Sequence, residues 1–178
     1  MTSSASRRAV IFDRDGVLNV DHGYVGQVDR LQWMAGARRA IRRLNDAAVL
    51  AIVATNQSGV ARGFFSEADV RRVHDAMQTD LAQEGARIDA FYVCPFHHEA
   101  VDPAYAHRDH PERKPNPGML LRAIADFGLD LGRTVMIGDQ ERDLEAARRA
   151  GIAGVLFSGG DLDAFVRSTP AVAALLTP

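Results

Sequence analysis

The chain has 178 residues, 47% of them hydrophobic, which is enough for one well-buried core but short for two independent ones. Its 21 Lys and Arg residues nearly balance 23 Asp and Glu residues, so the formal net charge is -2 at pH 7. No basic field therefore recruits nucleic acid or an anionic membrane, and we expect a single domain with a small substrate. Because no long apolar repeat is present, we also expect a monomer.

The termini and the cysteine content indicate a cytoplasmic protein. The longest apolar stretch, residues 47–54, is too short to cross a bilayer, and residues 1–8 lack the apolar segment of a signal peptide. We expect residues 1–8 to be flexible and residues 9–178 to form the domain. Cys94 is the single cysteine, so no internal disulfide can form, which agrees with a reducing compartment.

The first half of the chain begins with two predicted strands that flank a helix. The apolar runs at 9–12 and 48–55 are typical of buried parallel strands. Between them, apolar residues recur with helical spacing at Ala37, Ala40, Ile41 and Leu44. The outer face of this helix carries Arg38, Arg39, Arg42 and Arg43. These arginines could bind phosphate or nucleic acid, but we favour a solvated surface because no wider basic field adjoins them.

A second helix is predicted to begin at Ser66, whose hydroxyl can cap it, with Asp69 completing a capping box. Its expected buried face consists of Val70, Val73, Met77 and Leu81. A strand over 90–94 follows. After it comes an irregular stretch rich in His, Asp and Pro.

The remaining elements continue the alternation of strand and helix. Asn116 and Pro117 suit the N-cap and first position of a helix that stops at Gly128. A strand over 134–139, a further helix and a last strand near 154–157 complete the pattern. The predicted class is α/β, a single Rossmann-like domain with a mostly parallel sheet and helices on both faces.

Polar side chains stand where the predicted strands end. In sheets of this kind ligands bind beyond the carboxyl ends of the strands. The residues expected to meet along that edge are Asp13, Asp15, Thr55, Asn56 and Asp139.

Asp13 and Asp15 place two carboxylates on alternate residues, and Gly16 then allows a sharp turn. Unless a cation neutralises such a pair, one carboxyl has a raised pKa, which suits a pair in which one group attacks and the other carries a proton. An isolated Asp-x-Asp at a strand end more often makes a turn or a helix cap. Chemistry is favoured here because Thr55 and Asn56 add hydrogen-bond donors.

A cation is required if a carboxylate attacks a phosphate dianion. Two like unit charges about 4 Å apart repel by about 4 kcal/mol at an effective dielectric of about 20. Mg²⁺ held by Asp13, Asp139 and a backbone carbonyl near Asp15, with Lys114 opposite, would offset this repulsion. Asp143 supplies a further carboxylate.

Four segments in this order resemble the haloacid dehalogenase superfamily of phosphohydrolases: residues 13–19, 55–59, 114–115 and 138–143. The resemblance implies that Asp13 is the nucleophile and that Asp15 is first the general acid and then the general base. It also implies that Thr55 and Lys114 hold the phosphoryl group and that magnesium is bound at Asp13, Asp15 and Asp139. The second carboxylate, two residues after the first, favours a phosphatase over a dehalogenase.

A non-catalytic phosphoacceptor module is the alternative from another class, because receiver domains also place an aspartate at a strand end. Such a module does not need Asp15, so its presence favours turnover.

A narrower resemblance, carried by residues 19–25, 55–63 and 113–119, is to the heptose bisphosphate phosphatases and the related histidinol-phosphate phosphatases. It implies removal of the 7-phosphate of D-glycero-D-manno-heptose 1,7-bisphosphate, with histidinol phosphate or another small sugar phosphate as the alternative substrate. Arg113 is then placed to recognise the second phosphate. Gln140 stands where the family often has a basic residue. The candidate substrate-binding residues are Asp21, His22, Gly23, Tyr24, Asn56, Gln57, Ser58, Arg113 and Gln140. The segments 16–34 and 95–113 are too short to form a separate cap domain.

The family usually carries a zinc loop with Cys-x-His and Cys-x-Cys pairs before Arg-Lys-Pro. Here Phe96 occupies the histidine position, and His110 and Glu112 stand in place of the later cysteines. A spacing that could close a tetrahedral structural zinc site is still formed by Cys94, His97, His107 and His110. Histidines on a polar loop need no metal, so zinc and ordinary contacts are both open.

Overall fold

The computed structural model of the protein describes residues 7–177, so residues 1–6 of the expected flexible terminus lie outside the described part. Arg7 and Arg8 were expected to be flexible, and this is wrong because they begin the first strand. The Arg8 guanidinium donates to the carbonyls of Leu175 at 2.8 Å and Ala47 at 2.7 Å. These contacts hold Arg8 against two segments distant in the sequence, at residues 47 and 175.

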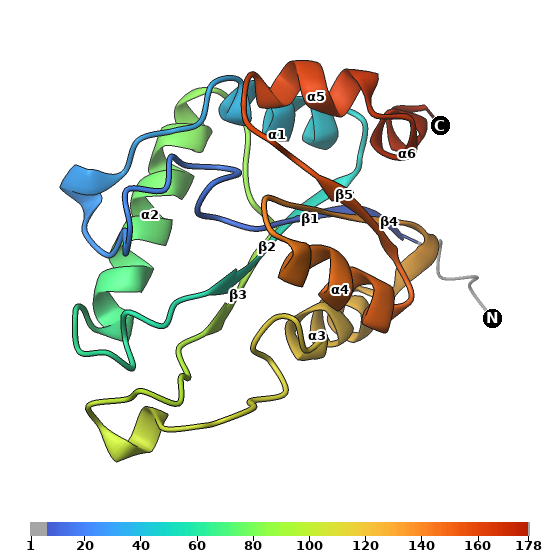
Figure 1. Cartoon of the computed structure of the whole chain (residues 1–178). Helices are drawn as coiled ribbons and strands as arrows, with labels where there is room; N and C mark the ends of the chain where they lie inside the picture. The colour runs from blue at the N-terminus through green and yellow to red at the C-terminus, as the bar shows by residue number, and fades with distance from the viewer. Residues whose placement is uncertain (1–6, 178) are drawn as a thin grey trace.

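A single parallel sheet forms the centre of the domain, with strand order β3-β2-β1-β4-β5 (Figure 1). Its strands are β1 Arg7–Phe12, β2 Leu50–Asn56, β3 Ala90–Cys94, β4 Leu129–Gly138 and β5 Ala153–Leu156. β1 pairs with β2 on one side and with β4 on the other, so the chain changes direction along the sheet at β1. Ligands bind in open α/β sheets at such a point.

Helices cover both faces of the sheet. They are α1 Ala37–Asp46, α2 Glu67–Gln83, α3 Gly118–Phe127, α4 Glu141–Ala150, α5 Leu162–Ser168 and α6 Pro170–Ala173. Short 3-10 turns lie at Val28–Arg30, Pro103–Tyr105 and Ala174–Leu176. No helix in residues 7–177 is long and apolar enough to cross a membrane.

Alternation along β1 separates two cores. Val10 and Phe12 pack with α1, α2 and α5, whereas Ala9 and Ile11 pack with α3 and α4 on the other face (Figure 1). The predicted α/β class, the parallel sheet and the absence of a separate cap domain in the described chain are confirmed.

The predicted N-cap is correct for α2 and wrong for α3. The capping box of Ser66 and Asp69 is present as predicted. The N-cap of α3 is Pro117 rather than Asn116. The Asn116 amide instead donates to the Asp109 carboxylate at 2.5 Å and to the His110 carbonyl at 3.0 Å, so it fixes the preceding loop.

The arginines on the outer face of α1 are paired with acidic side chains, which agrees with the favoured interpretation of a solvated surface. The pairs are Arg38 with Glu84, Arg39 with Asp161, Arg42 with Asp46 and Arg43 with Asp163.

Candidate active site

A cavity of about 420 Å³ opens at the carboxyl ends of the strands. It is lined by Asp13, Asp15, Asp21, Gly23, Tyr24, Asn56, Gln57, Ser58, Gly59, Arg62, His97, Arg113, Asp139 and Arg142. Most of the predicted site residues are therefore brought together. Thr55 and Lys114 do not line the cavity; they are buried, 1% exposed each, and contact the lining residues Gln57 and Asp13.

Lys114 is the centre of the buried charges. Its Nζ lies 3.0 Å from Asp13 Oδ1 and 2.8 Å from Asp143 Oδ1. Burial raises the pKa of the Asp13 carboxyl to about 6, while the Lys114 charge lowers it and the Asp143 charge raises it. The Lys114 ammonium thus lies between the carboxylates of Asp13 and Asp143.

Three carboxylates form a group that suits a divalent cation. Oxygens of Asp13, Asp139 and Asp143 lie within 4.8 Å of one another. Gly16, with φ +85°, lets the chain pass close to Asp139: a Cβ there would stand 2.3 Å from Asp139 Oδ2. Oxygen donors so close together fit Mg²⁺, which prefers a few carboxylates completed by water and phosphate oxygens.

A backbone carbonyl near Asp15, rather than the Asp15 carboxylate, was expected at the metal, and the carboxylate lies outside this group. It is held instead by other side chains. Arg14 donates to it through Nε at 3.2 Å and Nη2 at 2.9 Å, Asn19 Nδ2 donates at 2.9 Å, and Gln57 Nε2 donates at 2.8 Å. Asp143, which the sequence offered as a further carboxylate, completes the group with Asp13 and Asp139.

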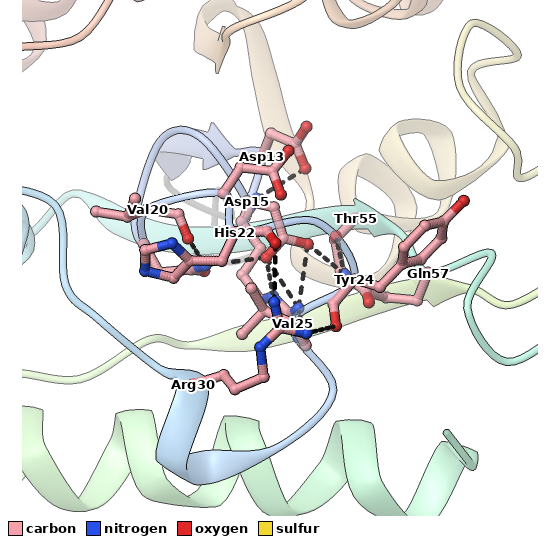
Figure 2. Close-up of polar contacts among 12 residues, drawn as sticks. Asp13, Asp15, Val20, His22, Tyr24, Val25, Arg30, Thr55 and Gln57 are labelled. Atoms are coloured by element: carbon pink, nitrogen blue, oxygen red, sulfur yellow. Dashed lines mark hydrogen bonds and ion pairs between the residues drawn. The ribbon is translucent and has the colours of Figure 1, made fainter. Parts of the chain in front are cut away.

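Gln57 was predicted to bind substrate, and it also connects Asp15 with Thr55 (Figure 2). Its Nε2 donates to Asp15 Oδ2 and to Thr55 Oγ1, both at 2.8 Å. Asn56, next to it, is tied to the backbone of Lys114: its Oδ1 accepts from the Lys114 amide at 3.0 Å. The two amide side chains therefore fix the catalytic candidates relative to one another.

The loop after β1 forms one wall of the cavity through Asp21, Gly23 and Tyr24. Asp21 Oδ1 accepts from the Gly23 amide at 2.8 Å. Tyr24 has a positive φ of 54° and packs edge-on against Phe64 at 4.7 Å. His22 does not line the cavity, contrary to the prediction. Its Nε2 pairs with Gln32 Oε1 at 2.9 Å, which turns the ring outward (Figure 2).

Gln140 was also expected at the substrate and is absent from the cavity lining. Its Nε2 donates to Asp139 Oδ2 at 3.0 Å. A basic side chain does reach the cavity from this region, but it is Arg142, in the first turn of α4. Arg142 was not among the predicted site residues, because a helix turn, and not the strand end, presents it.

Arginines form a basic wall of the cavity. Arg113 donates to the Phe96 carbonyl at 3.2 Å. Arg62, which was not among the predicted site residues either, pairs with Glu99 at 2.7 Å. Burial, followed by the charges of Arg142 and Arg62, lowers the pKa of Arg113. Like charges gathered in this way favour an anionic ligand.

The predicted zinc ligands do not assemble. Cys94 Sγ is 4.0 Å from His110 Nδ1, but no three of the candidate side chains bring ligand atoms within 4.8 Å of one another in residues 7–177. The His110 ring stacks on Phe96 at 3.9 Å, and His97 lines the cavity while its Nδ1 accepts from the Glu99 amide at 3.0 Å. The donor set does not fit a tetrahedral zinc site, and structural zinc is not supported.

The parallel sheet, the paired aspartates after β1, the buried lysine and the carboxylate group define a phosphatase of the haloacid dehalogenase-like class. A family model described as HAD-hydrolase-like matches residues 112–173. The chain is 49% identical over 94% of its length to a D-glycero-beta-D-manno-heptose-1,7-bisphosphate 7-phosphatase from Rhodopseudomonas palustris, 93% of which is covered. The chain therefore belongs to the D-glycero-D-manno-heptose-1,7-bisphosphate 7-phosphatase family.

Two further relatives describe the family. The D-glycero-alpha-D-manno-heptose-1,7-bisphosphate 7-phosphatase of Burkholderia mallei is 41% identical over 96% of this chain and 89% of its own. The crystal structure of a D,D-heptose 1,7-bisphosphate phosphatase from B. bronchiseptica, complexed with magnesium and phosphate, matches with a TM-score of 0.77 and 34% identity. That match covers 94% of this chain and 96% of the other.

Proposed function

We propose that this protein is a magnesium-dependent phosphomonoesterase that removes the 7-phosphate of D-glycero-D-manno-heptose 1,7-bisphosphate through an aspartyl-phosphate on Asp13. The observation that carries the proposal is the position of Asp13 in the cavity lining, 3.0 Å from Lys114 Nζ and within 4.8 Å of two further carboxylates. The names of the relatives, which are heptose-1,7-bisphosphate 7-phosphatases, support the choice of substrate.

In the first step, a carboxylate oxygen of Asp13 attacks phosphorus while the bond from phosphorus to the ester oxygen breaks. Lys114 and the hydroxyl of Thr55 hold the phosphoryl oxygens, and Asp15 gives its proton to the departing alkoxide. The products of this step are the sugar, with a free hydroxyl where the ester was, and phosphorylated Asp13.

In the second step, water attacks the phosphorus of the aspartyl-phosphate. Asp15, now ionised, takes a proton from that water, and the acyl-phosphate bond breaks at phosphorus. Inorganic phosphate leaves and the Asp13 carboxylate is restored. Asp15 thus ends the cycle protonated, as it began.

Asp13, Asp139 and Asp143 are the side chains that would hold Mg²⁺. The ion, when bound, neutralises charge between the attacking carboxylate and the phosphoryl oxygens. Without such compensation, Lys114 alone faces several carboxylates and an incoming dianion.

The basic wall supports the choice of a bisphosphate. Hydrolysis at one end leaves a second phosphate to be held, and Arg113 is the proposed partner because its guanidinium lines the cavity beside Arg62 and Arg142. Histidinol phosphate, the alternative, carries a single phosphate and a cationic amine. A wall of arginines disfavours that amine.

Phosphate release from both heptose bisphosphate anomers, with histidinol phosphate alongside, tests the substrate. Replacing Asp13→Asn tests the mechanism, with Asp46→Asn, an exposed aspartate at the end of α1, as the matched control. We expect no turnover in the first variant and full turnover in the second. Substantial magnesium-dependent activity in Asp13→Asn, or faster turnover of histidinol phosphate, would overturn the corresponding part of the proposal.

A cytoplasmic location and a monomeric state stay predictions. Light scattering on the purified protein measures the mass directly, and a value well above 19.4 kDa would contradict the monomer.

A further inference from the structure

His74, in the middle of α2, is a buried polar residue to which the proposed chemistry assigns no part. It is 6% exposed, and its ring stacks on Phe91 of β3 with centroids 4.1 Å apart and planes 12° from parallel. The sequence predicted the apolar face of this helix and did not include a histidine in it. The stack fixes the ring plane, so the direction of its nitrogen is fixed too.

The ring meets one charged partner. His74 Nε2 lies 3.3 Å from Nη1 of Arg14, which is completely buried. Burial, and then the Arg14 charge, lowers the pKa of His74 to about 3, so the ring is neutral at physiological pH. A neutral ring with Nε2 unprotonated accepts a hydrogen bond from the guanidinium.

The remaining nitrogens of Arg14 are committed to the catalytic loop. Nη2 donates to the Val25 carbonyl at 2.5 Å and to Asp15 Oδ1 at 2.9 Å, and Nε donates to Asp15 Oδ1 at 3.2 Å. A planar guanidinium with fixed donors on three sides cannot rotate. His74 therefore orients the Arg14 guanidinium, and the guanidinium in turn orients the Asp15 carboxylate.

The two oxygens of Asp15 are occupied unequally. Oδ1 lies within hydrogen-bond distance of Arg14 Nε at 3.2 Å, Arg14 Nη2 at 2.9 Å and Asn19 Nδ2 at 2.9 Å. Oδ2 accepts from Gln57 Nε2 at 2.8 Å and shares the Nη2 donor of Arg14 at the longer distance of 3.1 Å. An ionised carboxylate oxygen offers about two lone-pair sites. Three donors saturate Oδ1, whereas Oδ2 has one close donor and one shared, longer contact, so Oδ2 is the oxygen with more room for a proton.

We propose that Arg14 and His74 are positioning residues that saturate Oδ1 of Asp15 and present Oδ2 as the oxygen that exchanges the proton with the leaving group. This rests on the proposed function, in which Asp15 is the general acid. Neither Arg14 nor His74 touches the substrate. Their part is to keep one oxygen of the acid aimed at the ester bond.

The test uses leaving groups that differ in their need for an acid. Phenyl phosphate needs protonation of its departing oxygen, whereas 2,4-dinitrophenyl phosphate expels a stable anion without it. The ratio kcat/KM covers the first, leaving-group-dependent step. His74→Met removes the acceptor and keeps apolar bulk against Phe91, and His74→Gln restores an oxygen at the end of a side chain of similar reach.

For His74→Met we expect kcat/KM to fall about tenfold with phenyl phosphate and less than about threefold with dinitrophenyl phosphate. The tenfold loss is smaller than the usual gain from general acid catalysis, about 100-fold or more, because Asp15 itself is still present. His74→Gln should recover most of the loss. Gln78→Met is the matched control: one turn along α2, it loses hydrogen bonds of 2.7 and 2.9 Å to Ile88, so it should lower the melting temperature without changing the ratio between substrates.

An equal loss with both substrates would overturn the inference, because a merely structural residue affects both alike. If His74→Met does not fold, Arg14→Lys carries the same test, since an ammonium lacks the planar fork. Phosphatase activity that is retained in the Asp13→Asn variant would instead refute the proposed function. An Asp13-dependent activity with an unchanged ratio in the variants refutes only the positioning of Asp15.

Discussion

Lys114 Nζ lies 2.8 Å from Asp143 Oδ1, and both side chains are fully buried. Lys114 is the single lysine of the chain, and the other 20 of its 21 Lys and Arg residues are arginines. A compact ammonium can enter a site between two carboxylates where a guanidinium, with its larger plane, cannot. The pair therefore links the proposed nucleophile site to the first turn of α4.

Replacing Lys114→Met should leave Asp13 and Asp143 as buried carboxylates without their cation. Removing one partner of a buried ion pair costs about 3–5 kcal/mol, so we expect a markedly lower melting temperature and loss of phosphatase activity. Mg²⁺ should restore part of the lost stability, because it takes over the missing positive charge. Calorimetry with and without Mg²⁺ measures both effects.

The control for this variant is Arg148→Met, which removes an exposed ion pair with Glu145. Exposed pairs contribute about 0–1 kcal/mol, so the stability of Arg148→Met should change little. Mg²⁺ should raise its melting temperature by the same amount as that of the wild type. If Mg²⁺ raised the melting temperature of Lys114→Met no more than that of the wild type, the carboxylate group would not be the metal site.

Gly16 gives a second test of the same site. In Gly16→Ala the new Cβ would stand 2.3 Å from Asp139 Oδ2 at a backbone φ of +85°, so Asp139 must move. We expect the Mg²⁺ concentration needed for half-maximal activity to rise at least about tenfold, equivalent to about 1.4 kcal/mol of binding energy. Magnesium titration of the phosphatase rate measures it.

Gly85→Ala is the matched control, because its φ is +69° and nothing lies within 4 Å of the new Cβ. It should lose about 1–2 kcal/mol of stability from backbone strain alone, with an unchanged magnesium requirement. Equal magnesium requirements in the two variants would show that the approach of Gly16 to Asp139 is unimportant for the metal.

The strand ends were predictable because each apolar run stops at a polar residue. Asp13, Thr55 and Asp139 are found at one edge of the sheet for that reason alone. Asp143 was noted as a further carboxylate, but its place beside Lys114 depends on how α4 starts, which strand periodicity does not fix.

Contacts between distant residues were out of reach of the sequence. Arg14 and His74 are 60 positions apart, and no motif connects them. The loop after β3 shows the opposite error, in which spacing suggested a zinc site. Spacing restricts distance along the chain but does not orient rings, and the stack of His110 on Phe96 turns that ring to a different partner.

His74 should make the protein less stable as the pH falls. Its pKa is about 3 in the folded protein against an ordinary value of 6.5, so between these values the unfolded chain binds a proton that the folded chain does not. Within this range, His74 then lowers the free energy of unfolding by about 1.4 kcal/mol for each pH unit below 6.5. Asp13 has the opposite sign, because its raised pKa favours protonation in the folded state.

Urea unfolding of wild type and His74→Gln from pH 7 to pH 4.5 separates the two contributions. The contribution of Asp13 is common to both proteins and cancels in the difference. The wild type should lose its advantage over the variant as the pH falls through this range. Parallel stability curves would contradict a neutral, buried His74.

Arg113 is expected to recognise the second phosphate. Arg62 is already paired with Glu99, whereas the side-chain contact of Arg113 is with the backbone carbonyl of Phe96, so its charge is available to a ligand. A hydrogen bond to a charged group contributes about 1.5–3 kcal/mol, so Arg113→Met should raise KM for heptose bisphosphate about tenfold to a hundredfold. Steady-state kinetics with the bisphosphate and with phenyl phosphate, which has no second phosphate, measures the difference.

The control is Arg122→Met, an arginine of α3 that pairs with Glu112 and does not line the cavity. It should leave KM for both substrates unchanged. For Arg113→Met, KM for phenyl phosphate should stay within about twofold of the wild-type value, because that ligand has no second phosphate to reach the basic wall. A twofold change in KM corresponds to about 0.4 kcal/mol of binding free energy. A similar rise of KM for both substrates would show that Arg113 holds the reacting phosphate or the cavity wall, and would remove the reason for assigning it to the second one.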